Sequence, residues 1–99
     1  MSYSDLVAAD IRLAILTILA RANDYTANAY ALQTGLATDY GHALSLDRLR
    51  TELAWLDEQR LLTVQRPGGI DLATLNSRGY DVRRGVSSVP GIARPRPEL

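Results

Sequence analysis

Arginine is the residue type with the clearest chemistry in this 99-residue chain, because every basic residue except one histidine is an arginine. A guanidinium can bind a phosphate or a base edge through two parallel hydrogen bonds. Arg48, Arg50 and Thr51 fall in one segment with helical periodicity, and Arg66 precedes the turn that follows it. These side chains therefore suggest binding of a phosphate-containing partner.

The charge balance opposes this suggestion. Eleven arginines are matched by eleven carboxylates, and affinity for nucleic acid depends on neutralising phosphates. The helical segment itself carries acidic residues, which phosphates would repel. Its mixture of charges is also typical of a helix face that is simply exposed to solvent. The absence of lysine fits the codon usage of a GC-rich genome better than selection for bidentate contacts. The acids of this segment are Asp47, Glu52, Asp57 and Glu58.

Other site chemistries lack the residues they need. The chain has no cysteine, which excludes disulfides and thiolate metal sites. His42 stands alone, without a carboxylate at ligand spacing, so we interpret it as a turn residue. We find no nucleophile, base and orienting group, and no glycine-rich phosphate loop. We therefore expect no enzymatic activity, no cofactor and no metal.

The element that would position these arginines is a helix from the N-cap Ser45 to about Gln59. Its leucines recur at steps of three and four residues, which fixes the buried face. Trp55 lies on the opposite side, either as an exposed interface anchor or, as we favour, covered by a neighbouring element. Two strand-like segments follow, 61–66 and 70–74, joined by Pro67-Gly68-Gly69.

Three further helices are predicted around this unit. One covers residues 5–22 with Ser4 as N-cap, and a weaker one runs from residue 27 or 28 to Tyr40. The turn between them covers 23–26. Asn76 caps a final helix that Gly85 ends. The fold class is thus mostly α with a small β-hairpin: a winged helix-turn-helix with a three-helix core, a two-stranded wing and a C-terminal helix. The domain would span 1–85, and 86–99 would form a tail containing proline and arginine, extended and mobile near its end.

Several of these residues resemble the motifs of a known superfamily. Leu53 and Leu56 lie three apart on the third helix, and 75–79 (Leu-Asn-Ser-Arg-Gly) open the last helix. This resembles the winged-helix superfamily of bacterial regulators, including the arsenic-repressor-like and multiple-antibiotic-resistance-like groups. The whole chain is similar to small winged-helix proteins of Mu-like phages and prophages. That similarity is carried by 10–13, 50–56 and 89–91.

Two residues depart from the superfamily pattern. Arg60 stands where glycine usually follows the recognition helix, and a left-handed conformation there would cost about 1–2 kcal/mol. Asn76 replaces the usual threonine, which is harmless because both residues cap helices. The cysteines of the metal-sensing groups are absent, so metal-regulated DNA release is not implied.

The first helix is apolar over more than one face, and an apolar face must be covered. We predict that it pairs with a second copy and forms a homodimer. The alternative is that the C-terminal segment covers it within one chain. The predicted interface residues are Leu6, Val7, Leu13 and Leu16.

The resemblance implies a partner and a site. Double-stranded DNA would be bound by the third helix in the major groove, with Arg66 of the wing in the minor groove or on a phosphate, and with a flexible basic arm at the C-terminus. Ser45 and the helix N-terminus could hold a phosphate. The predicted DNA-binding residues are Ser45, Arg48, Arg50, Thr51, Arg66, Arg94 and Arg96.

The sequence thus predicts a phage or prophage transcriptional regulator in the cytoplasm of a bacterial host. No signal peptide or membrane span is expected, because the longest apolar run is shorter than the ~20 residues a bilayer requires. The alternative function is an interaction or assembly adaptor that keeps the winged-helix scaffold but does not bind DNA.

Overall fold

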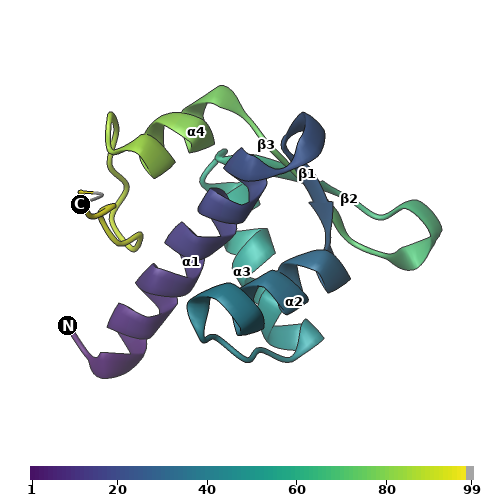
Figure 1. The fold of residues 1–99 in the computed structure, drawn as a ribbon, viewed down its shortest axis with the longest axis horizontal. Helices are drawn as coiled ribbons and strands as arrows, with labels where there is room; N and C mark the ends of the chain where they lie inside the picture. The colour runs from purple at the N-terminus through teal and green to yellow at the C-terminus, as the bar shows by residue number, and fades with distance from the viewer. Residues whose placement is uncertain (98–99) are drawn as a thin grey trace.

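A small antiparallel sheet packed against helices forms the centre of the computed structural model, which describes residues 1–97 (Figure 1). Within these residues there are four α-helices and three strands, so the mostly α class is confirmed. The elements in chain order are α1 (Tyr3–Arg21), a 3-10 turn (Asn23–Tyr25), β1 (Thr26–Asn28), α2 (Ala29–Tyr40), α3 (Leu46–Glu58), β2 (Leu62–Gln65), a second 3-10 turn (Pro67–Gly69), β3 (Leu72–Leu75) and α4 (Ser77–Arg84).

The sheet has one strand more than the sequence predicted. β3 lies in the centre of the strand order β1-β3-β2, with both neighbours antiparallel. The predicted two-stranded wing is present as β2 and β3, and β1 adds a third strand that the sequence did not predict. β1 pairs Thr26 with Thr74, and their hydroxyls are 3.0 Å apart. Three residues are too few for a period-2 pattern, and this segment was predicted as the end of a turn and the start of the second helix.

Helix caps account for where the helices begin. Asn28, Ser45 and Asn76 each accept a backbone N–H of the following turn, and the last two were predicted as caps. The second helix was predicted to start at residue 27 or 28, but Asn28 is its cap and α2 begins at Ala29. At α1 the prediction was wrong by two residues. Ser2 is the N-cap, and it forms a capping box with Asp5.

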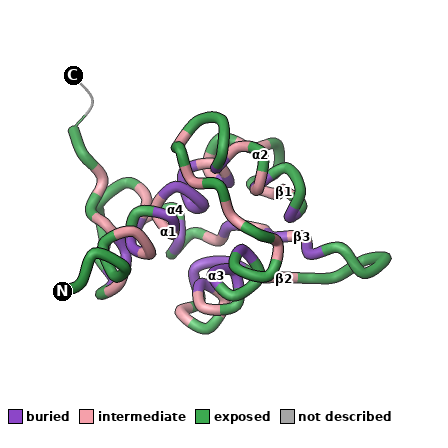
Figure 2. The backbone as a smooth tube through the Cα atoms, turned by 90° about the horizontal axis from the view of Figure 1, so that it is seen from below, coloured by how far each residue is buried: buried purple, intermediate pink, exposed green. Residues whose placement is uncertain are grey.

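The core lies where α1, α2, α3 and the sheet meet (Figure 2). The predicted leucine face of α3 is confirmed, since Leu49, Leu53 and Leu56 are at most 1% exposed. In α1, two of the leucines predicted to face a second copy differ in burial, because Leu6 is 54% exposed and Leu16 is fully buried.

Two close approaches fix how the helices pack. A Cβ on Gly35 would lie 3.1 Å from Ile18 Cδ1, which confirms close contact of α1 and α2. A Cβ on Gly79 would lie 2.1 Å from the Leu61 carbonyl oxygen, so α4 can begin beneath the hairpin because this residue has no side chain. Arg60 has φ +62°, the left-handed conformation that the resemblance implied.

The segment after α4 turns back onto α1. Val89 and Ile92 are buried in the core, and the Ala93 N–H donates to the Ala9 carbonyl oxygen at 3.1 Å. Residues 86–97 therefore cover part of α1 within the chain, as the alternative prediction for the apolar helix required. The last two residues of the predicted tail, 98–99, lie outside the described part of the chain.

Candidate nucleic-acid interface

Arg50 and Arg66 meet at a buried carboxylate between α3 and the β2–β3 turn. Asp71 is 6% exposed, and its oxygens lie 3.2 Å from Arg50 Nε and 2.7 Å from Arg66 Nε. The contact between Arg66 and Oδ1 is an ion pair without hydrogen-bond geometry, because Oδ1 has no hydrogen-bond partner. Both arginine side chains remain about half exposed. The structure thus brings together two residues predicted at separate positions of the sequence.

These side chains lie along an open groove between α3 and the wing. One wall comes from α3, including Asp47, Arg50 and Thr51. The other comes from Val64 and Arg66 in the hairpin. We name it the α3–wing groove, and its residues are Asp47, Arg50, Thr51, Leu53, Ala54, Asp57, Val64, Arg66 and Asp71.

Arg48 does not line the α3–wing groove. Its Nε donates to Glu52 Oε2 at 2.8 Å, on the opposite border of the exposed face of α3. At about 100° per residue, the positions Arg48 and Arg50 are ~160° apart around the helix. The expectation that Arg48 and Arg66 form one continuous surface is therefore wrong. The exposed ridge between the two borders contains Asp47, Thr51 and Glu58.

A second buried carboxylate explains the position of Arg48. Glu52 is 4% exposed and also accepts from Arg12 Nε at 2.7 Å, so α1 and α3 share one charge cluster. Arg12 in turn donates to the Gly91 carbonyl oxygen at 2.9 Å. The two clusters have the same form, a buried carboxylate between two arginines, and one arginine of each comes from α3.

Trp55 is covered by these groups. The Arg12 guanidinium lies 3.9 Å from the centre of its ring, a cation–π distance. Gly91 approaches so closely that a Cβ there would be 3.0 Å from Trp55 Cζ2. The prediction that Trp55 packs against a neighbouring element is confirmed, and that element is the tail together with Arg12.

Two predicted polar residues of α3 use their hydroxyl groups within the helix. Ser45 Oγ accepts the Arg48 N–H at 3.1 Å, and Thr51 Oγ1 donates to the Asp47 carbonyl oxygen at 3.0 Å. Both residues are exposed. Thr51 lies in the groove, and Ser45 begins the helix that forms one of its walls.

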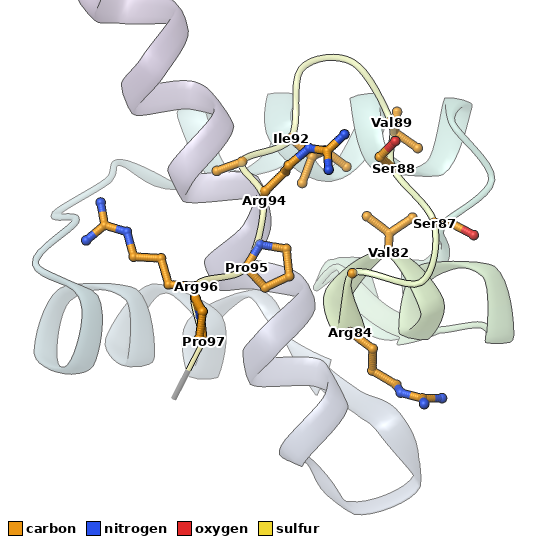
Figure 3. Close-up of a pocket in the computed structure, with 12 residues that line it drawn as sticks. Val82, Arg84, Ser87, Ser88, Val89, Ile92, Arg94, Pro95, Arg96 and Pro97 are labelled. Carbon is orange, nitrogen blue, oxygen red and sulfur yellow. The ribbon is translucent and has the colours of Figure 1, made fainter. Parts of the chain in front are cut away.

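Arg94 and Arg96 lie away from the α3–wing groove. They line hollows with α4 and α1, at the end of the molecule opposite the wing (Figures 1 and 3). A basic arm placed beside the wing is therefore not what the structure shows. The tail is held on α1, which turns these arginines toward a different surface.

The predicted dimer residues are mostly covered within the chain. Leu16 is fully buried and cannot contact a second copy. Val7 and Leu13 are half-buried against the core, and Leu6 is exposed. The apolar surface that remains lies at the first turns of α1, around Tyr3 and Leu6.

His42 has a structural role in the turn before α3. Its Nε2 lies 2.7 Å from Asp10 Oδ2 and links the turn before α3 to α1. Among residues 1–97, no group of three or more His, Asp or Glu side chains is arranged to hold a metal ion. In the same part of the chain, no helix has the length and apolarity needed to cross a bilayer.

Sequence reasoning missed the two carboxylates that organise the site. Glu52 carries a usable signal, since it stands four residues after Arg48, the spacing of an ion pair on a helix. Its second partner, Arg12 on α1, could not be predicted, because this contact depends on how the two helices pack. Asp71 follows the Pro-Gly-Gly turn in a strand-like segment, where a buried acid needs a cationic partner. That requirement points to Arg66, five residues earlier.

The similar proteins give the family and the fold. No family model matches the chain. An uncharacterised protein of Haemophilus influenzae is 42% identical over 79 residues, covering 79% of this chain and 76% of that protein. The hsRosR chains in the complex structures hsRosR-S4 and hsRosR-S1 superpose with TM-scores of 0.64 and 0.68, at 22% and 20% identity.

The hsRosR-S4 match covers 74% of this chain and 62% of the hsRosR chain, which is less than two thirds of it. The hsRosR-S1 match covers 82% of this chain and 70% of the hsRosR chain. At such low identity the similarity establishes the fold, which is a winged helix. The uncharacterised protein gp26 of Escherichia phage Mu is 44% identical over 94 residues, which cover 95% of this chain and 96% of that protein. The chain therefore belongs to the family of the phage Mu protein gp26.

Proposed function

We propose that this protein binds duplex DNA through α3 and the wing, as a transcriptional regulator of phage or prophage origin in the cytoplasm of a bacterial host. The observation that carries the proposal is the arginine pair Arg50 and Arg66, held by Asp71 along the α3–wing groove. In helix-turn-helix proteins the helix equivalent to α3 enters the major groove. The wing would then lie against the adjacent backbone.

The ion pairs leave these arginines able to bind DNA. Asp71 contacts each guanidinium through Nε, and a guanidinium has five N–H donors. Terminal N–H groups can therefore bind phosphate oxygens or guanine edges. Asp71 offsets only one of the two arginines, but Asp47 and Asp57 also line the groove, so its net charge is −1. Asp47 and Glu58 on the exposed ridge oppose phosphates, so we expect modest affinity.

The phage part of the proposal is supported by family membership. The relative from phage Mu matches this chain over almost its whole length, and that protein is itself uncharacterised. The hsRosR neighbours were determined as complexes, which supports a winged helix that works by binding a partner.

Pairing of two copies is a further part of the proposal, limited to the exposed end of α1. Tyr3 and Leu6 are 82% and 54% exposed there. A stable interface buries about 800 Å² on each partner, more than so small a patch provides. We therefore place the pairing on DNA, where half-sites about 34–36 Å apart would bring two copies together.

The test is titration of labelled duplex DNA, random and phage-derived, at several salt concentrations. The variant Arg50→Gln with Arg66→Gln should lose two phosphate contacts and reduce the log–log salt slope by about 1.8. Arg60→Gln is the matched control, because Arg60 is exposed and does not line the groove. If the unmodified chain binds no duplex at low salt, DNA binding is wrong and the assembly adaptor becomes the better function.

A further inference from the structure

Four arginines at the C-terminal side of the chain have no carboxylate within ion-pair distance in the described residues. Arg12, Arg48, Arg50 and Arg66 are each paired with Glu52 or Asp71. Among residues 1–97, Arg60 and Arg78 have no such partner either, and the other four come from the last turn of α4 and from the tail. They are Arg83, Arg84, Arg94 and Arg96, and we name them the tail surface.

The distribution of charge along the chain points to the same region. Residues 76–99 contain five arginines and two acidic side chains, Asp81 and Glu98, a side-chain net charge of +3. Residues 45–75, which form α3 and the wing, contain four arginines and five carboxylates, a net charge of −1. The neutral total thus conceals a basic part of the molecule, and an anionic partner would be attracted to that part first.

The tail surface surrounds an open pocket of about 350 Å³. Val82, Ile92 and Pro95 contribute apolar lining, and Ser87 and Ser88 contribute hydroxyls. Among residues 1–97 no acidic residue lines this pocket, whereas Asp39 lines the second hollow beside it. Figure 3 shows the guanidinium groups of Arg84, Arg94 and Arg96 extending in different directions around Pro95. Diverging cations suit several phosphates spaced along a strand better than one small anion.

The backbone that carries these arginines is fixed in place. The Ala93 N–H donates to Ala9 on α1, and Pro95 packs so closely on Gly85 that a Cβ there would lie 3.2 Å from Pro95 Cγ. Prolines on both sides of Arg96 further restrict the chain. Less conformational entropy is therefore lost when these side chains bind.

We propose that the tail surface binds the phosphate backbone of nucleic acid, independently of the α3–wing groove. Its two hollows are lined by α1, α4, the end of α2 and the tail. The groove is lined by α3 and the hairpin, and the two sets of lining residues do not overlap. One molecule can therefore hold two segments of nucleic acid, a property that goes beyond the proposed sequence-dependent binding.

The test compares two charge variants of the full chain and their combination. The tail variant carries Arg84→Gln, Arg94→Gln and Arg96→Gln, and the groove variant carries Arg50→Gln and Arg66→Gln. Binding of a labelled random-sequence duplex is followed by fluorescence anisotropy at several salt concentrations, with circular dichroism and thermal melting to verify folding. The groove variant should still bind, with a salt slope of about −2.7 for three phosphates, and the combined variant should not.

Three results separate the two proposals. If the groove variant and the combined variant bind equally, the tail surface has no role and this inference is overturned, whereas the α3–wing function is unaffected. If the tail variant does not bind and the groove variant binds like the unmodified chain, the inference holds and the α3–wing function fails. If labelled poly-L-glutamate binds the groove variant more tightly than duplex DNA does at equal salt, the surface serves an acidic protein and the inference is overturned.

Discussion

Two buried carboxylates, Glu52 and Asp71, determine what the arginines of α3 can do. A carboxylate removed from water costs several kcal/mol unless cations and hydrogen bonds compensate it. Each of these acids contacts two arginines at 2.7 to 3.2 Å. Arg48 and Arg50 therefore stabilise the fold before they can serve any partner, and a count of arginines on α3 overstates its attraction for phosphates.

Replacing Glu52 tests this structural role. Glu52→Gln removes the charge that holds Arg12 and Arg48, and should lower the free energy of unfolding by about 2–3 kcal/mol. This value is below that of a fully buried pair because Arg48 is 43% exposed. Urea denaturation measures it. Glu58→Gln, on the exposed ridge of the same helix, is the control and should change stability by less than about 0.5 kcal/mol. Equal effects of the two changes would contradict the cluster.

Gly79 offers a second test at a single residue. An added methyl group would collide with the Leu61 carbonyl oxygen and with the Leu75 side chain. Because a backbone atom cannot move away easily, Gly79→Ala should cost at least about 3 kcal/mol.

The matched control for that change is Gly35→Ala in α2. There the nearest atom is the flexible end of Ile18 at 3.1 Å, and alanine gains about 1 kcal/mol in helix propensity. The two effects nearly offset, so stability should stay within about 1 kcal/mol. Thermal melting of both variants measures the difference, and a Gly79→Ala protein as stable as the unmodified chain would refute the close approach of α4 to the hairpin.

At the scale of elements, the sequence predicted those with a local signal. α3 could be predicted because Ser45 caps it and its leucines recur at helical steps, and α4 because Asn76 and Gly85 mark its ends. β1 could not, because it becomes a strand only by pairing with Leu72, Ala73 and Thr74, 44 to 48 residues later. The start of α1 was misplaced because Ser2 and Ser4 are both suitable caps.

The site was predicted less well than the fold. Periodicity places a side chain on a face of its own helix, but the neighbour it meets depends on how elements pack. Arg50 and Arg66 were both named, yet their common partner Asp71 was not. The tail arginines were expected on a flexible arm, which has no fixed position. The hydrogen bond between Ala93 and Ala9 fixes the tail on α1, so Arg94 and Arg96 lie on a different surface from the α3–wing groove.

Packing of the tail on α1 and α3 can be tested through Ile92, which is 9% exposed. Ile92→Ala should destabilise the protein by about 2 kcal/mol and loosen the tail from Trp55. Tryptophan emission should therefore move to longer wavelength. Val86→Ala, at a residue that is 65% exposed, should leave both stability and emission unchanged. Unchanged emission in the Ile92 variant would show that the tail does not shield the indole ring.

At the scale of the whole molecule, most of the apolar surface of α1 is covered by the chain itself. Leu16 lies in the core and the tail packs along the helix, leaving a small patch near Tyr3 and Leu6. Light scattering of the free protein should therefore give the monomer mass, near 10.9 kDa. A stable species of twice that mass at micromolar concentration would instead establish the dimer predicted from sequence. Leu6→Asp would then show whether this patch forms the interface.

The central position of β3 has a consequence for synthesis on the ribosome. Both edge strands hydrogen-bond to β3, whose last residue is Leu75, so neither β1 nor β2 can join the sheet before about three quarters of the chain has been made. Until then the apolar sides of α1 and α2 have no sheet to cover them, and they resemble the exposed segments that chaperones bind. Nascent chains stalled before Leu72 emerges from the exit tunnel should therefore be cut readily by proteases, whereas those stalled after the tail has emerged should resist them.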